Sequence, residues 1–189
     1  MKAQLSINPI KKMSLFLILI FASAVCIGQP TVVESDFSKG LAAYDQSDYA
    51  TAVTLFTKAA QNGDMEAQFY LGHLYRKGVG VTLNKEEAFK WLKKAAEQGH
   101  IRAQFDLGLM YASGYGVTKN IPEAIKWYRV AAQQGNPEAQ YFLGRMYQKG
   151  QGLTQSNDEA KKWYKIAAGT SGHGIGKQLA AAGLLELGK

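Results

Sequence analysis

Histidine and cysteine are the side chains best suited to catalysis or metal binding, and this chain of 189 residues holds three histidines and one cysteine. A metal site needs several ligands close together, and a nucleophile needs a base beside it. His73, His100 and His173 have no acidic or cysteine partner at ligand spacing, and Cys26 stands alone. The sequence therefore predicts no catalytic residue, no metal ligand and no cofactor, and a structural or solvent-exposed role for each histidine.

The segment from Gly169 to Lys177 is a further candidate, because a glycine-rich loop before a lysine can bind phosphate. That loop has the pattern G-x4-G-K-[ST] and follows a strand. Here Ser171 stands where the first glycine belongs, Gln178 replaces the Ser or Thr, and no strand is expected before it. The segment is not predicted to bind a nucleotide.

Small and aromatic residues recur at intervals of 36 residues. The recurring sets are Gly72, Gly108 and Gly144; Tyr75, Tyr111 and Tyr147; Gly78, Gly114 and Gly150; Gly80, Gly116 and Gly152; Trp91, Trp127 and Trp163; and the Ala-Ala pairs at 95–96, 131–132 and 167–168. A period of this length is typical of stacked repeat architectures. With 47% hydrophobic residues and one cysteine, the composition favours a folded domain without a disulfide framework.

Each unit is predicted to form two helices. In the first helix, Ala67, Leu71 and Tyr75 lie on one face. Gly72 inside this helix costs about 1 kcal/mol relative to alanine, so its recurrence predicts a neighbouring helix too close to admit a Cβ. A glycine pair, Gly78 with its partner two residues on, is expected to end the helix and turn the chain.

The second helix places Ala88, Trp91 and Ala95 on one face, and Gly99 ends it. We expect the recurring tryptophans to pack in the core; the alternative is an exposed row that stacks on carbohydrate. Helix pairs repeated in this way form a right-handed α/α solenoid, so the predicted fold class is all-α.

The pattern Ala67-x3-Leu71-Gly72-x2-Tyr75-x2-Gly78-x-Gly80, followed by Ala88-x2-Trp91-x3-Ala95-Ala96-x2-Gly99, resembles the Sel1-like repeat. This is a relative of the tetratricopeptide repeat with a longer loop between its helices. The resemblance implies a solenoid that serves as a binding scaffold in bacterial envelope and signalling assemblies. Many members have Asp where this chain has Asn84, Asn120 and Asn157, and either residue can cap the next helix.

These features divide the chain into seven segments. The predicted segments are a signal peptide at 1–28, a flexible lead-in at 29–34, a tetratricopeptide-like helix pair at 35–62, Sel1-like repeats at 63–98, 99–134 and 135–170, and a C-terminal capping helix at 171–189.

The resemblance also implies which side chains face the inner, concave side. Aligning Gly72 with the small residue of the tetratricopeptide first helix places on this side Glu66, Phe69, His73 and Arg76, then Arg102, Phe105, Leu109 and Ala112, then Glu138, Tyr141, Arg145 and Gln148. One interpretation is an aromatic ladder of Phe69, Phe105 and Tyr141 in a peptide-binding groove, with arginines for carboxylates. The other is that the aromatic residues pack against the second helix of their own unit.

Basic residues gather late in the second helices. They are Lys90, Lys93, Lys94, Lys126, Arg129, Lys161, Lys162 and Lys165. Acidic residues stand at the starts of the same helices, an order that suits the helix dipole and ion pairs at i,i+3 or i,i+4. The alternative is a basic stripe that binds an anionic envelope surface.

The first 28 residues have the three parts of a secretory signal peptide. Lys11 and Lys12 precede an apolar run that begins at Met13, and small residues then allow cleavage after Ala24 or Gly28. An uncleaved anchor and lipid attachment at Cys26 stay open as alternatives. Without this segment the net charge falls from +7 to +4, which does not call for a nucleic-acid partner.

The sequence thus predicts a non-enzymatic scaffold of the bacterial periplasm, or a secreted one, that binds a protein or peptide through its concave face. An alternative is a peptidoglycan or β-lactam hydrolase similar to the cysteine-rich members of the family. This chain lacks their cysteines and shows no catalytic set.

Overall fold

The computed structural model describes residues 34–170 and 174–188 of the chain. Their secondary structure is entirely helical, without a strand. The helices are α2 (Asp36–Asp45), α3 (Tyr49–Gln61), α4 (Met65–Lys77), α5 (Lys85–Glu97), α6 (Ile101–Ser113), α7 (Ile121–Gln133), α8 (Pro137–Lys149), α9 (Asn157–Gly169) and α10 (Ile175–Leu187). The predicted signal peptide and residues 29–33 lie outside the described residues.

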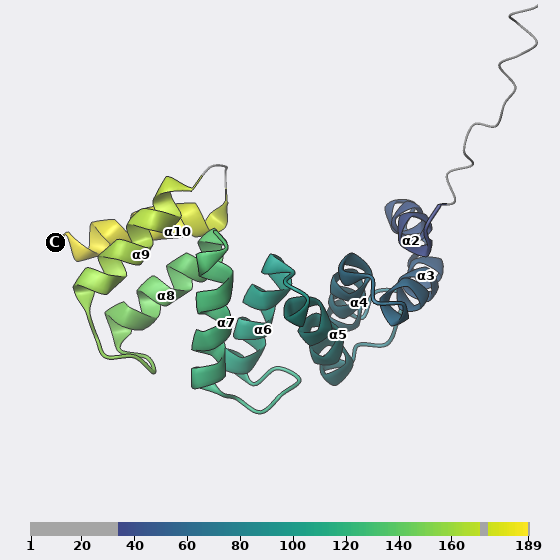
Figure 1. Ribbon diagram of the computed structural model, residues 1–189, viewed down its shortest axis with the longest axis horizontal. Helices are drawn as coiled ribbons and strands as arrows, with labels where there is room; N and C mark the ends of the chain where they lie inside the picture. Colours follow the sequence, from purple (N-terminus) through teal and green to yellow (C-terminus); the bar gives the residue numbers. More distant parts are fainter. Residues whose placement is uncertain (1–33, 171–173, 189) are drawn as a thin grey trace, which may run out of the picture. The chain divides into compact units, whose positions relative to one another are not determined.

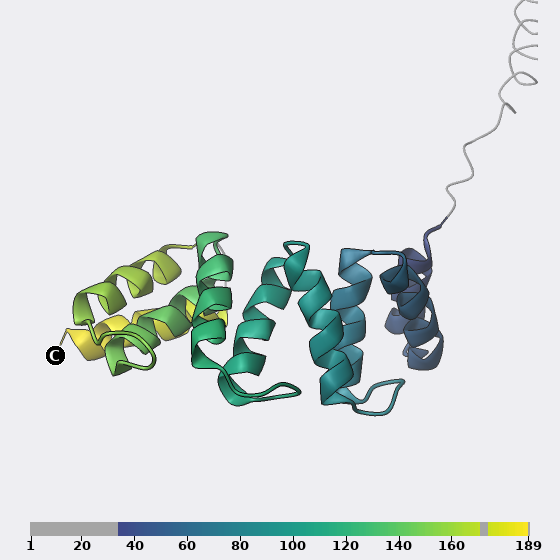
Figure 2. The same ribbon diagram turned by 60° about the horizontal axis from the view of Figure 1, so that its bottom comes forward.

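The helices follow one another in chain order as a row of antiparallel pairs, from α2 at one end to α10 at the other (Figures 1 and 2). Each helix contacts the next along the chain, and α10 contacts both α8 and α9. The described residues therefore form an α/α solenoid, as the 36-residue period predicts, and it ends in a capping helix, as expected for the segment after the last repeat.

The two helices of each repeat meet at the recurring glycine. A Cβ placed on Gly72, Gly108 or Gly144 would lie 2.5 to 2.6 Å from a side chain of the second helix of the same pair. The side chains that fill this space are Leu92, Tyr128 and Tyr164. The predicted close approach is confirmed.

The residue that enters the core is the one after each tryptophan. Leu92, Tyr128 and Tyr164 are at most 1% exposed, whereas the tryptophans are half-buried. Each tryptophan packs on a buried cluster formed by the second helix of the preceding unit and the first helix of its own, as Trp91 does on the cluster that contains Phe56 and Leu71. The tryptophans pack as predicted, and they help to hold neighbouring units together.

The glycine pairs in the loops have two different tasks. Gly78, like its two counterparts, ends the first helix in the left-handed conformation, with φ at 67°. The second glycine of each pair lies against the first residue of the second helix one unit earlier, so that a Cβ on Gly80 would collide with the backbone of Tyr49. These loops therefore fix the stacking of successive units.

Asparagine side chains begin two of the second helices. The Oδ1 atoms of Asn84 and Asn120 accept hydrogen bonds from the backbone N–H groups of Glu87 and Glu123, at 2.9 and 3.1 Å. The helix α9 differs from the expectation, because Ser156 caps it and Asn157 is already its first residue. Ser156, not Asn157, stands 36 residues after Asn120.

Buried glutamines tie the units together. The Nε2 groups of Gln68, Gln104 and Gln140 each donate to a carbonyl near the end of the preceding second helix, at 3.0 to 3.3 Å. Gln98 and Gln134 donate in turn to the amide oxygens of Gln68 and Gln104, at 2.7 and 2.8 Å.

The third unit lacks the second of these bonds. Thr170 stands where Gln98 and Gln134 stand in the other units, and its hydroxyl donates to the carbonyl of Ala167 instead. The buried Oε1 of Gln140 has no hydrogen-bond partner among the described residues.

The capping helix packs through small residues. Gly176 lies against the backbone of Pro137 and Glu138, and Gly183 lies against the ring of Tyr164. Its other side is apolar and open, with Ile175 70% and Leu185 72% exposed.

The glycine contact predicts a loss of stability on substitution. Gly108→Ala should lower the free energy of unfolding by about 1–3 kcal/mol, because the new Cβ would lie 2.6 Å from the buried Tyr128 ring. Gly169→Ala is the control, since nothing lies within 4 Å of a Cβ there. Urea unfolding followed by circular dichroism measures both. Equal stability of the two variants would contradict the close approach.

Candidate binding surface

The first helices of the three repeats, α4, α6 and α8, form a surface that we call the first-helix face. A cleft of about 340 Å³ opens on it. Its lining residues are His73, Arg76, Arg102, Phe105, Asp106, Asn136 and Glu138. Five of these seven were predicted to face the concave side, and Asp106 and Asn136 were not.

A charged cluster forms one wall of the cleft. Nε2 of His73 lies 2.8 Å from Oδ2 of Asp106, and a guanidinium nitrogen of Arg76 lies 3.0 Å from Nδ1 of the same histidine. A second Arg76 nitrogen is 3.8 Å from Oδ1 of Asp106. Because arginine can only donate, Nδ1 accepts from Arg76 and the proton of the neutral ring sits on Nε2, where it is donated to Asp106.

His100 has a structural role at the start of α6. Its Nδ1 accepts from the backbone N–H of Ala103 at 3.1 Å and so caps the helix, while Nε2 lies 3.3 Å from Oε2 of Glu66. Both histidines thus contact a carboxylate of a neighbouring unit, which the sequence spacing did not reveal. His173 lies outside the described residues.

Phe69 is not free to bind a partner. It is 6% exposed, because the His100 ring stacks on it at 4.1 Å between centroids and the Arg102 guanidinium lies 5.3 Å from its centroid. Arg102 itself is exposed, with no carboxylate of the described residues within ion-pairing distance.

The other two aromatic residues of the expected ladder are half-buried. Phe105 contacts the rings of Tyr128 and Phe142 and still lines the cleft. Tyr141 stacks on Tyr164, at 5.7 Å between centroids, and belongs to the cluster that α10 covers. The three aromatic residues therefore do not form one continuous exposed row.

The last predicted positions lie beside the capping helix. Arg145 is exposed and lies 5.9 Å from the centroid of Tyr141. Gln148 accepts a hydrogen bond from the Tyr164 hydroxyl at 2.8 Å and donates to Glu186 of α10 at 3.5 Å. Burial raises the pKa of Tyr164 to about 12.

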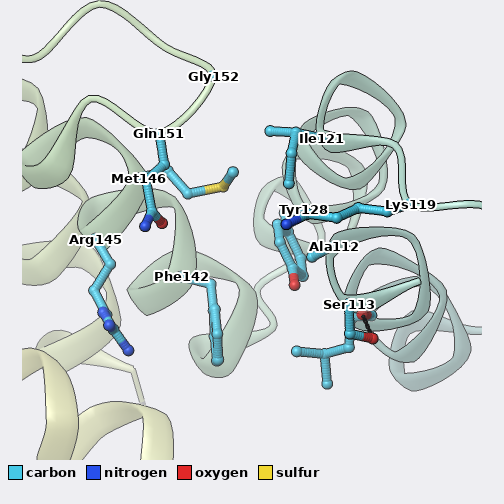
Figure 3. A pocket seen from close by; sticks show the side chains of 11 residues that line it. Ala112, Ser113, Lys119, Ile121, Tyr128, Phe142, Arg145, Met146, Gln151 and Gly152 are labelled. Atoms are coloured by element: carbon cyan, nitrogen blue, oxygen red, sulfur yellow. Dashed lines mark hydrogen bonds between the residues drawn. The ribbon is translucent and has the colours of Figure 1, made fainter. Parts of the chain in front are cut away.

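A second hollow of about 490 Å³ lies where the second and third repeats meet; we call it the junction pocket (Figure 3). It contains Leu109, Ala112 and Arg145 of the predicted set. Its other lining residues are Ser113, Lys119, Ile121, Tyr128, Phe142, Met146, Gln151 and Gly152.

Half of the eight basic residues named for the second helices, Lys90, Lys93, Lys126 and Lys162, pair with a carboxylate of their own helix. Lys90 pairs with Glu87 at 2.6 Å, and equivalent pairs recur 36 and 72 residues on, at 3.6 and 3.7 Å. These are the i,i+3 pairs expected from the order of charges. Such exposed pairs contribute little stability, but they leave less free charge for an anionic surface.

The described residues hold neither a metal-binding cluster nor a membrane-spanning helix. No group of three or more His, Cys, Asp or Glu residues in 34–170 and 174–188 is placed to hold a metal ion. None of the helices α2 to α10 has the length and apolar character needed to cross a membrane.

Comparison with known proteins shows that the chain is similar to Sel1 repeat proteins. The family model described as the Sel1 repeat matches residues 37–64, 66–100, 101–136 and 137–168. A Sel1 repeat protein from Oxalobacter formigenes is 38% identical, with a TM-score of 0.71, over 80% of this chain and 58% of that one.

A protective antigen of uropathogenic Escherichia coli strains with an SLR fold is 31% identical, with a TM-score of 0.68, over 82% of this chain and 38% of that one. The chain thus spans 58% and 38% of the lengths of these two relatives. No curated protein matches it in a sequence comparison.

The contact between His73 and Asp106 predicts an energetic coupling between α4 and α6. A double-mutant cycle of His73→Ala and Asp106→Ala should give a coupling of about 0.5–3 kcal/mol in unfolding experiments, because Asp106 is nearly buried and each partner satisfies the other. The exposed pair Lys162 and Glu159 is the control, with about 0.5 kcal/mol or less expected. A coupling no larger than that of the control would contradict the assignment.

Proposed function

Because the chain belongs to the Sel1 repeat family, we propose that it is a non-enzymatic scaffold that binds a partner protein or peptide through its first-helix face. The observation that carries this proposal is the cleft that α4, α6 and α8 line together. It gathers side chains from three repeats that are 36 residues apart in sequence. A surface that spans several repeats suits the binding of an extended peptide segment better than that of a small molecule.

The composition of the cleft suits a protein partner. Arg102 is exposed and offers a guanidinium for a carboxylate of the partner. Phe105 supplies a half-buried ring, and aromatic side chains with little freedom left are favoured anchors in protein interfaces. Asp106 and Glu138 add negative charge, so the cleft offers both signs to its partner.

The alternative of a hydrolase receives no support from the histidines. A nucleophile needs a histidine or another base that is free to take its proton. His73 bonds to Asp106 and Arg76, and His100 caps α6 through its Nδ1. The alternative of an anionic-surface binder is weakened by the ion pairs within the second helices.

The proposal places the scaffold in the bacterial periplasm or outside the cell, because residues 1–28 have the layout of a signal peptide. The protein purified from an envelope or periplasmic fraction should then begin at Val25 or Gln29, as measured by mass spectrometry of the intact chain. A chain that keeps Met1 in the cytoplasmic fraction would contradict export. A first residue of Cys26 that carries lipid would show the anchored form instead.

Charge reversal on the first-helix face should weaken binding of the partner protein. We expect crosslinking and pull-down from bacterial envelopes to capture a protein with the wild type, and about tenfold less of it with Arg102→Glu/Arg145→Glu. Both side chains are exposed, so the fold should persist.

The matched control is Lys93→Glu/Lys165→Glu, which makes the same change of charge on exposed residues of α5 and α9. Equal capture by the two double variants would move recognition away from the first-helix face. Capture of nothing by the wild type would argue against a scaffold role.

A further inference from the structure

The junction pocket lies where two residues depart from their counterparts one unit earlier, at positions that differ in every repeat. One unit earlier, between the first and second repeats, the equivalent space is filled. There the ring of Tyr115 packs against the core cluster and its hydroxyl donates to the carbonyl of Arg76 at 3.2 Å. The residue 36 positions after Tyr115 is Gln151, an exposed side chain, and the residue 36 positions after Arg76 is Ala112.

The same departure leaves a buried hydroxyl without a partner. Tyr128 is 1% exposed and lines the junction pocket, and its hydroxyl has no hydrogen-bond partner among the described residues. One unit later the equivalent Tyr164 donates to Gln148. Ala112 occupies the position of Gln148 in the second unit and has no group that can accept this bond. The protein itself therefore offers no hydrogen-bond acceptor to this hydroxyl at the wall of the pocket.

The wall of the junction pocket is apolar. Phe142 and Met146 of α8 face Ile121 and Tyr128 of α7 across it (Figure 3). A volume of about 490 Å³ leaves room for a large apolar side chain, and pockets of this size and character hold apolar groups.

The rim of the junction pocket is basic. Lys119 and Arg145 line it, both are exposed, and no carboxylate of the described residues lies within 4 Å of either cation. Beside the filled junction the corresponding residues are Leu83 and Leu109, which carry no charge. The open junction therefore carries its cations at two other positions, and it has Ala112, Ser113 and Ile121 where the filled junction has Arg76, Lys77 and Lys85.

We propose that the junction pocket binds a large apolar side chain of an acidic partner segment, whose carboxylates pair with Lys119 and Arg145. This inference rests on the proposed function, because it names the chemistry of the segment that the first-helix face recognises. The apolar anchor supplies the buried contact area, and the carboxylates fix its orientation at the rim.

Filling the pocket tests the proposal. A random peptide library displayed on phage is selected on the full chain, and the bound peptides are synthesised and titrated by fluorescence polarisation. We expect the selected peptides to share a large apolar residue beside Asp or Glu. Gln151→Tyr should weaken their binding about tenfold or more, because the new ring takes the space of the anchor as Tyr115 does one unit earlier.

The matched control is Thr154→Tyr, which adds the same ring to an exposed position of the same loop outside the pocket. Its affinity should stay within about twofold of the wild type. Circular dichroism shows whether both variants keep their helices. Should Gln151→Tyr fail to fold, Arg145→Glu replaces it: it should weaken acidic peptides about tenfold and improve versions in which Lys replaces the acids.

Three results would overturn the inference. They are selected peptides without the apolar and acidic pair, equal binding by Gln151→Tyr and wild type, and a selection that enriches nothing. If the envelope pull-down still captures a protein through Arg102 and Arg145, the proposed function stands and only the chemistry assigned to the junction pocket fails. If the pull-down fails as well, both proposals fall.

Discussion

The contact between a glycine of the first helix and a buried side chain of the second sets the geometry of every repeat. Gly72, Gly108 and Gly144 let the two helices approach until Leu92, Tyr128 and Tyr164 touch backbone. Glycine is unfavourable inside a helix, and the packing that it permits offsets this cost. With the pair fixed, the second loop glycine and the tryptophan each reach a defined partner in the neighbouring unit.

The same regularity explains where specificity can lie. Positions that hold the units together carry the same residue in each repeat. A binding site that occurs at one place along the solenoid must therefore be built from positions whose residues differ between repeats. The cluster of His73, Arg76 and Asp106 occurs at one junction, and the opening left by Ala112 and Gln151 occurs at the next. Two junctions with the same backbone thus present a charged cleft and an apolar pocket.

The period of the sequence was enough to predict the helix pairs, the turns and the close approach at Gly72, because these depend on residues within one unit. Contacts between units were harder to predict. Equivalent residues are 36 apart, but His73 meets Asp106 at a separation of 33, one helical turn short of the period. The burial of Phe69 had the same cause, since His100 and Arg102 of the next unit cover it. An offset of one turn, applied to the residues of the first helices, would have found the contacts of His73 with Asp106 and of Phe69 with Arg102, both at a separation of 33.

The glutamine bonds are also unequal along the chain. Gln98 and Gln134 link the end of each second helix to the first helix of its own unit, but Thr170 makes no such link in the third unit, and the Oε1 of Gln140 has no partner in the part of the chain that the structure describes. In a linear array the stability of each unit adds to that of its neighbours, so a weak member at one end sets the direction of fraying. The end of α9 and the helix α10, which packs on it, should therefore open first on heating.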